Sequence, residues 1–232
     1  MLSYIKHNLN KILNNIASAL ISSSRVPGSV KLLAVSKTFP SEAILEAYNC
    51  GQRCFGENRL HELETKVPSL PDDIEWHFIG KLQSNKVNKA VELVSYIHSV
   101  DSQKILSRID RIARDKGKKP KIFLEVNISG EGSKSGLSLE HVENCAILAS
   151  ESENVELVGL MTMAPYDADE SVLKRIFALL RQTRDELQQK LNISLPELSM
   201  GMSSDYKEAI AEGSTIVRIG TSVFGKRDYA SK

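Results

Sequence analysis

Residues 30–40 read Val-Lys-Leu-Leu-Ala-Val-Ser-Lys-Thr-Phe-Pro, and this stretch is the first indication of the fold. Its aliphatic part is short, stops at Lys37 and is closed by Pro40, so it predicts a buried strand rather than a helix. Lys37 then lies at the carboxyl end of that strand. Open parallel sheets and closed barrels both bind their ligands at this end, so Lys37 is a candidate functional residue.

Seven more apolar runs of strand length follow, separated by stretches of helical period. The predicted strands are Leu32–Ser36, Arg53–Phe55, Glu75–Ile79, Tyr96–Val100, Lys121–Asn127, Leu157–Met163, Leu198–Met200 and Thr215–Ile219. The predicted helices between them are Ser41–Asn49, Arg59–Lys66, Asn85–Leu93, Ser102–Lys116, Leu139–Ser150, Glu170–Lys190 and Ser204–Glu212. This alternation is typical of repeated strand–helix units and a parallel sheet.

A further helix is predicted over Met1–Ser22, ahead of the first strand. Its apolar stripe includes Ile5, Ile12, Leu13 and Leu20. We expect this helix to pack on the outside of the sheet or to close one end of it.

Eight such units predict a single-domain α/β protein, a (β/α)8 TIM barrel with an additional N-terminal helix. We divide the chain into the N-terminal helix and lead-in (residues 1–28), the barrel (29–225) and a tail (226–232). An open doubly wound sheet is the main rival, because local patterns do not settle whether a sheet closes. The number of strands favours the barrel, and no Gly-x-Gly-x-x-Gly follows the first strand.

The composition argues against several classes of function. The net charge is +1, with 30 Lys plus Arg against 29 Asp plus Glu, so nucleic acid is not expected as a partner. No segment has the apolar length of a signal peptide or a membrane span, so we expect a cytoplasmic protein without a membrane partner. The 3 cysteines and 5 histidines have neither a disulfide pattern nor a metal-ligand spacing, so no metal site is predicted.

If the barrel closes, polar residues that follow the strands share one rim. They are Lys37, Asn58, Lys81, Asp101, Asn127, Thr162, Ser203 and Thr221. A lysine held against apolar walls loses solvation of its charged form, so its amine can attack a carbonyl and form a Schiff base. The simpler interpretation, a strand-end lysine that reaches solvent, stays open at this point.

The last two strand ends, residues 199–203 and 218–221, supply glycines and hydroxyls. Loops after strands seven and eight of a barrel commonly bind phosphate through such groups. Glycines that merely end strands are an equally good interpretation of the residues. A carbonyl-reactive lysine together with a phosphate site suggests one ligand that carries both an aldehyde and a phosphate, which is pyridoxal 5'-phosphate (PLP).

The chain also resembles the N-terminal domain of alanine racemase and, more closely, the single-domain pyridoxal phosphate homeostasis protein family. The matching segments are residues 34–37 (AVSK), 55–58 (FGEN), 76–86 (WHFIGKLQSNK), 134–136 (KSG), 159–163 (GLMTM), 198–203 (LSMGMS) and 217–221 (VRIGT). They appear in family order and span nearly the whole chain.

The resemblance implies a role for each site residue. Lys37 would form the internal aldimine with PLP, and Asn58 would lie beside the cofactor. Arg218 would face the pyridine nitrogen, and because an arginine does not give up its proton, it would weaken the cofactor as an electron sink. The phosphate would be held by Ser203, Gly220 and Thr221.

The resemblance further implies a non-catalytic carrier that buffers PLP or delivers it to PLP-dependent apo-enzymes. The alternative is a single-domain PLP-dependent amino-acid racemase or lyase. Alanine racemase takes a second base, a tyrosine, from a further domain that this chain lacks, and only Tyr166 and Tyr206 lie near the rim. For the same reason we expect a monomer.

Two other possibilities remain at this point. A Schiff-base aldolase of the same fold would use Lys37 without a cofactor, but the first strand offers no acid for proton transfer. Lys134, in a glycine- and serine-rich loop after the fifth strand, is a second amine for handing PLP on. A solvated loop lysine is the simpler interpretation of Lys134.

Overall fold

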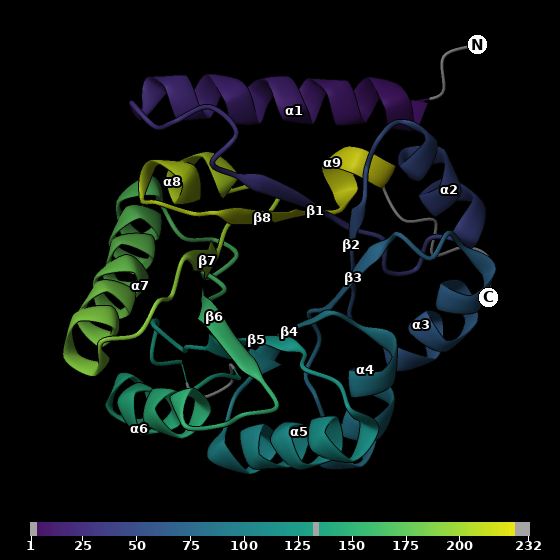
Figure 1. Ribbon diagram of the computed structural model, residues 1–232. Coiled ribbons are helices and arrows are strands. Elements are labelled where there is room, and N and C mark those ends of the chain that lie inside the picture. Colours follow the sequence, from purple (N-terminus) through teal and green to yellow (C-terminus); the bar gives the residue numbers. More distant parts are fainter. Residues whose placement is uncertain (1–3, 132–134, 226–232) are drawn as a thin grey trace.

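The computed structural model describes residues 4–131 and 135–225 (Figure 1). Eight parallel strands in this part of the chain form a closed barrel in the order β1 to β8, with β8 paired to β1. The strands are β1 (Lys31–Val35), β2 (Cys54–Glu57), β3 (Glu75–Phe78), β4 (Tyr96–Val100), β5 (Lys121–Glu125), β6 (Glu156–Met161), β7 (Glu197–Ser199) and β8 (Ile216–Ile219). The predicted TIM barrel is confirmed, and the open doubly wound sheet is wrong.

Helices surround the barrel (Figure 1). The α-helices among the described residues are α1 (Tyr4–Ser22), α2 (Ser41–Asn49), α3 (Leu60–Lys66), α4 (Val87–Leu93), α5 (Gln103–Lys116), α6 (Leu139–Ser150), α7 (Glu170–Leu191), α8 (Tyr206–Ala211) and α9 (Thr221–Phe224). Two short 3-10 helices, η1 (Val67–Ser69) and η2 (Ser84–Lys86), precede β3 and α4. None of the helices in the described part of the chain combines the length and apolarity needed to cross a membrane.

Some predicted boundaries of strands and helices are wrong. The fifth strand was expected to reach Asn127, but it ends at Glu125. The amide of Asn127 donates to the carbonyl oxygen of Leu137 in the following loop (2.9 Å), so it is not available to a neighbouring strand. The predicted helix Asn85–Leu93 starts with the 3-10 turn η2 instead of regular α-helix. Lys134 and the predicted tail 226–232 lie outside the described residues.

The N-terminal helix α1 lies on the outside of the barrel beside α8, α9 and α2 (Figure 1). Its buried face consists of Ile5, Leu9, Ile12, Ile16 and Leu20. Leu13 was expected on the same stripe but is 48% exposed, because its neighbour Ile12 takes the inward position. The prediction that α1 packs on the outside is confirmed.

Side chains on each strand alternate between the barrel interior and the layer beneath the helices. A small apolar cluster fills the interior, with Leu33, Tyr96, Phe123 and Ile216 among its members. Leu33 pairs in register with Arg218, which places this arginine on the interior side of β8. Lys37 follows the carboxyl-terminal end of β1 by two residues, which places it at the carboxyl-terminal mouth of the barrel.

Candidate functional site

The segment that carries Lys37 is anchored by the residue before it. Ser36 is fully buried, and its hydroxyl donates to Glu57 Oε1 at the end of β2 (2.7 Å). The ammonium group of Lys66, at the end of α3, donates to the Ser36 carbonyl oxygen (3.1 Å) and to Glu57 Oε1 (2.7 Å). Lys37 itself is half-buried. The residue that precedes Lys37 is therefore held in place by buried hydrogen bonds.

The residue after Lys37 is held by the same network. Thr38 adopts a left-handed backbone conformation (φ 70°), and its amide donates to Glu62 Oε2 (2.7 Å). Glu62 Oε2 also accepts from Lys66 Nζ (2.7 Å). A non-glycine residue with positive φ is strained and persists only where the surroundings hold it. The ion-pair network thus fixes the direction in which the chain leaves Lys37.

The carboxyl group of Glu57 has an unusual environment. Its side chain is completely buried, and burial raises its pKa to about 7, although Lys66 acts in the opposite direction. Partial burial would also raise the pKa of Glu62, but hydrogen bonds from Lys66 and the Thr38 amide lower it. Sequence reasoning missed Lys66; the only local signal was its position three residues after the buried Leu63 on α3.

Arg218 lies inside the barrel, next to the strand that leads to Lys37. It is 5% exposed, and its NH1 group donates to the carbonyl oxygen (2.6 Å) and to the hydroxyl (2.7 Å) of Ser199. Its NH2 group donates to the carbonyl oxygen of Thr162 (2.8 Å). Burial lowers the pKa of Arg218 to about 10, so the guanidinium remains charged at neutral pH. These three bonds do not use all N–H donors of a guanidinium.

Two glycines shape the predicted phosphate loops for different reasons. A Cβ on Gly220 would come within 3.0 Å of the carbonyl oxygen of Val35, so glycine allows the loop after β8 to approach β1 closely. Gly201 has a φ of 95°, and a Cβ there would meet Ala209 at 2.7 Å. Gly201 is therefore required by packing against α8. Ser203 is half-buried in the same loop.

Thr221 and Asn58 complete the predicted set. Thr221 is exposed at the start of α9, directly after Gly220. Asn58 follows β2 and is half-buried, and its side-chain oxygen Oδ1 is buried without a hydrogen-bond partner in the described structure. A Cβ on Gly80 would meet the Asn58 carbonyl oxygen at 2.1 Å, so this glycine is needed to bring the loop after β3 against Asn58.

Not every residue predicted on the rim takes part in it. The hydroxyl of Thr162 donates to the carbonyl oxygen of Val126 (2.8 Å), so it is already used within the sheet. Tyr206 buries its ring in the core, whereas Tyr166 is 88% exposed. Glu125, the last residue of β5, is a buried polar residue that the sequence did not indicate. It is 3% exposed and accepts a hydrogen bond from the Ser135 hydroxyl (2.6 Å). Burial raises the pKa of Glu125.

One group of metal-binding side chain types occurs at the opposite, amino-terminal mouth of the barrel. Donor atoms of Cys54, Glu75 and His77 lie within 4.8 Å of one another. Spacing along the sequence did not reveal this group, because its members come from two neighbouring strands. The Lys31 ammonium lies 3.1 Å from the same Glu75 oxygen that Cys54 and His77 contact. The absence of a metal site stays a prediction.

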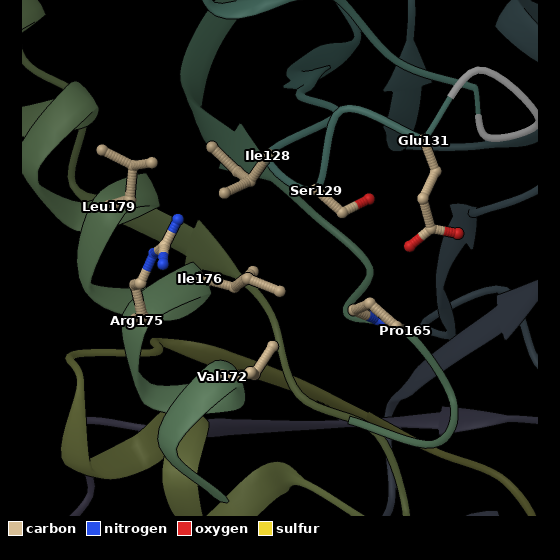
Figure 2. Close-up of a pocket in the computed structure, with 8 residues that line it drawn as sticks. All are labelled: Ile128, Ser129, Glu131, Pro165, Val172, Arg175, Ile176 and Leu179. Atoms are coloured by element: carbon tan, nitrogen blue, oxygen red, sulfur yellow. The ribbon is translucent and has the colours of Figure 1, made fainter. Parts of the chain in front are cut away.

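A separate cavity of about 260 Å³ lies between the loops after β5 and β6 and helix α7. Figure 2 shows its apolar wall, which includes Ile128, Pro165 and Ile176. None of the predicted site residues lines it. A cavity of about 210 Å³ at the rim is more relevant, because Asn58 and Lys81 line it.

Comparisons with known proteins identify the family to which this chain belongs. The family model described as "Alanine racemase, N-terminal domain" matches residues 2–228. A pyridoxal phosphate homeostasis protein of Aquifex aeolicus is 43% identical over 222 residues, which are 95% of this chain and 97% of that protein. The protein of the same name from Escherichia coli K12 is 39% identical over 235 residues, 98% of this chain and 99% of the relative. The chain belongs to the pyridoxal phosphate homeostasis protein family.

Solved structures of other proteins have a similar barrel fold. The structure of PipY of Synechococcus elongatus PCC7942 with PLP bound has a TM-score of 0.80 and 44% identity, and the match covers 90% of this chain and all of PipY (100%). Alanine racemase from Corynebacterium glutamicum has a TM-score of 0.75 at 16% identity, over 98% of this chain and 62% of the racemase. The racemase likeness shows the shared fold alone, and the family resemblance predicted from the sequence is confirmed.

Proposed function

We propose that this protein binds PLP at the carboxyl-terminal mouth of the barrel and acts in PLP homeostasis. The relatives described above are named pyridoxal phosphate homeostasis proteins, and PipY was solved with PLP bound. The observation that carries the proposal is the placement of an anchored lysine, Lys37, one strand away from a buried arginine, Arg218. An amine that reacts with an aldehyde and a fixed donor for a ring nitrogen are the two groups that PLP binding requires.

The residues present fit PLP. Within the described residues, the hydrogen bonds of Arg218 leave N–H donors over, so it would donate to the pyridine nitrogen. The buried Oδ1 of Asn58 would accept a hydrogen bond beside the ring. The phosphate would be held by Ser203, Gly220 and Thr221, in the loops after β7 and β8. A Cβ at Gly220 would crowd the Val35 carbonyl oxygen at 3.0 Å, which supports a role of this loop in shaping the cavity.

The proposed covalent link is a Schiff base at Lys37. PLP supplies an aldehyde, with which the lysine amine condenses as one water molecule is released. The chain's own contribution is positional, because Ser36 and Thr38 hold the lysine segment from both sides. Arg218 cannot transfer a proton to the ring nitrogen at neutral pH, so the ring would be a weak electron sink.

We propose that the protein buffers PLP or delivers it to PLP-dependent apo-enzymes rather than acting as an enzyme. The alternative, a PLP-dependent amino-acid racemase or lyase, needs a proton donor or acceptor besides Lys37. The expected tyrosines support this role poorly, since Tyr206 is buried in the core and Tyr166 is 88% exposed. Lys134, as a second amine for transfer, stays a hypothesis.

We further propose that the protein works as a monomer in the cytoplasm. The described cysteines are all free thiols, which fits a reducing compartment. Burial raises the pKa of Cys54 to about 12 and that of Cys145 to about 11, so neither is a reactive thiolate. Light scattering of the purified protein would give its molar mass and test the monomer.

The visible absorption spectrum with PLP tests the proposal. After unbound PLP has been removed by gel filtration, wild type should be yellow and Lys37→Ala should not, while the surface variant Lys174→Ala, as control, should match wild type. Incubation with L-alanine should then give no racemisation or decarboxylation. A yellow band with turnover would favour the racemase or lyase, and a colourless wild type would refute PLP binding at Lys37. A colourless protein that forms a reducible adduct with a carbonyl substrate would point to an aldolase.

A further inference from the structure

A continuous chain of hydrogen bonds crosses the barrel interior from the amino-terminal mouth to Arg218. His77 Nε2 lies 3.0 Å from Glu75 Oε1, and His77 Nδ1 lies 2.8 Å from His98 Nε2. His98 Nδ1 lies 2.8 Å from Ser199 Oγ, which accepts from Arg218 NH1 at 2.7 Å. These residues belong to β3, β4, β7 and β8, so this series of hydrogen bonds forms only because the sheet closes.

The two ends determine the direction of every bond. A guanidinium has donors only, so Ser199 Oγ accepts from Arg218. At the other end, Glu75 Oε1 forms an ion pair with the Lys31 ammonium (3.1 Å) and accepts from the Cys54 thiol, so this group is a carboxylate that only accepts. His77 must therefore carry a proton on Nε2.

The tautomers of both histidines follow. A neutral His77 with Nε2 protonated has Nδ1 as its acceptor, so His98 must donate from Nε2. His98 then accepts at Nδ1 from the hydroxyl of Ser199, whose oxygen accepts from Arg218 at the same time. Each donor meets an acceptor, and all donors point from Arg218 toward Glu75.

Packing keeps both imidazole rings neutral. Tyr96 stacks on His77 and Phe123 stacks on His98, each with 4.2 Å between the ring centroids. Both histidines are completely buried, and burial lowers the pKa of His77 and, more strongly, that of His98. A charged imidazolium would also reverse at least one bond of the chain.

We propose that His77, His98 and Ser199 form a directed hydrogen-bond relay that positions the Arg218 guanidinium and connects it to Glu75 at the opposite mouth of the barrel. The relay does not conduct protons to Arg218, because the guanidinium neither gives up nor takes a proton at neutral pH. It orients the donors that face the cofactor ring, and this consequence rests on the proposed PLP site. His77, His98 and Ser199 are positioning residues.

A metal ion on Cys54, Glu75 and His77 would require the opposite arrangement. It would take the lone pair of His77 Nε2, so His77 Nδ1 would donate to His98 and His98 Nδ1 would donate to Ser199. The Ser199 hydroxyl would then lose His98 as its acceptor. The relay and the metal site therefore predict different tautomers for the same two rings.

The first experiment measures these tautomers in the full-length protein without PLP, by two-bond ¹⁵N–¹H correlation spectra at neutral pH. His77→Gln and His98→Gln assign the signals, and His141→Gln, at an exposed position, is the control. The relay predicts that both rings are neutral and protonated at Nε2. A proton on Nδ1 of either ring, a charged ring, or a shift of the His77 signals to a metal-bound form on addition of Zn²⁺ would overturn it.

The second experiment measures PLP affinity and the position of the visible band. Ser199→Ala and Glu75→Leu should each weaken PLP binding by about tenfold and shift the band, since each leaves a buried histidine without one hydrogen-bond partner. Glu75→Gln should restore most of the affinity, because its amide oxygen still accepts from His77. Unchanged binding in Glu75→Leu would overturn the relay, as would a loss in Glu75→Gln equal to that in Glu75→Leu. Failure of wild type to bind PLP would refute the proposed function while leaving the tautomer test intact.

Discussion

Two buried cations in this barrel, Lys66 and Arg218, are each 5% exposed but are compensated in different ways. The Lys66 ammonium lies 2.7 Å from a carboxylate oxygen of Glu57 and 2.7 Å from one of Glu62, so its charge is compensated by direct ion pairs. The hydrogen bonds of Arg218 go instead to neutral oxygens of Ser199 and Thr162, and no ion pair to it occurs among the described residues; Asp205 and Glu125 act on it only through their charge. The first arrangement fastens the Lys37 segment, and the second keeps a charged donor available for a ligand.

The difference follows from the cost of burying charge. A buried cation that is paired with carboxylates contributes to holding elements together, and removing one member of the pair leaves the other uncompensated. A buried cation with only neutral partners retains attraction for an acceptor that enters the cavity. We therefore expect substitutions at Lys66 to affect mainly stability and substitutions at Arg218 to affect mainly PLP binding.

Lys66→Met should have the largest effect on stability. It leaves Glu57 buried without its cation, so the free energy of unfolding should fall by about 3–5 kcal/mol near neutral pH. Urea denaturation measures this loss. The double variant Lys66→Met/Glu57→Gln should recover part of it, since the uncompensated carboxylate is then gone. An equal loss in both variants would mean that the pair is not the source of the effect.

Arg218→Met should destabilise the protein less, by about 1–3 kcal/mol, because it removes donors from neutral oxygens rather than a charge from a carboxylate. PLP affinity should fall more than tenfold in the same variant, as titration of the visible band would measure. If Arg218→Met bound PLP as tightly as wild type while losing several kcal/mol of stability, the contrast with Lys66 would be incorrect.

The pH dependence of stability separates the two carboxyl groups next to Lys66. Glu57 has a pKa of about 7 in the folded protein, above its usual 4.5, so its stabilising protonation is complete below about pH 4.5 and is lost as the pH rises through about 7. Glu62 has a lowered pKa, so its contribution is present above about pH 4.5 and is lost on acidification. Relative to wild type, Glu57→Gln should gain stability from pH 4.5 to 7, and Glu62→Gln should gain it below pH 4.5.

Thermal unfolding between about pH 2.5 and 8 would measure both slopes. The buried histidines add a third slope in wild type and variants alike, because their lowered pKa values destabilise the folded state as the pH falls below about 6.5. Differences between variant and wild type cancel this shared slope. A Glu57→Gln difference that does not change with pH would contradict the raised pKa of Glu57.

Lys174→Ala should have the smallest effect. The ion pair between Lys174 and Glu170 lies on the surface of α7, with side chains 48% and 68% exposed, so solvent and salt screen it. We expect no measurable change in stability or in PLP binding. A clear loss in either measurement would show that burial is not what distinguishes Lys66 from other lysines.

Arg218 and Lys66 also differ in how far they were predictable. Arg218 lies in a segment that resembles the family, and its role was predicted from that segment. Lys66 ends a helix, where a lysine is ordinarily solvated and favourable near the last carbonyl groups. Nothing in its neighbours indicates that Glu57, on a strand nine residues earlier, lies beneath it.

The sequence by itself determined the strand and helix alternation, the position of Lys37 at a strand end and the family, because these depend on local periodicity and contiguous segments. Only the tertiary structure decided which polar groups meet inside the barrel. The contact of His98 with Ser199, for example, spans 101 residues. Such contacts depend on closure and register of the whole sheet, which no local propensity encodes.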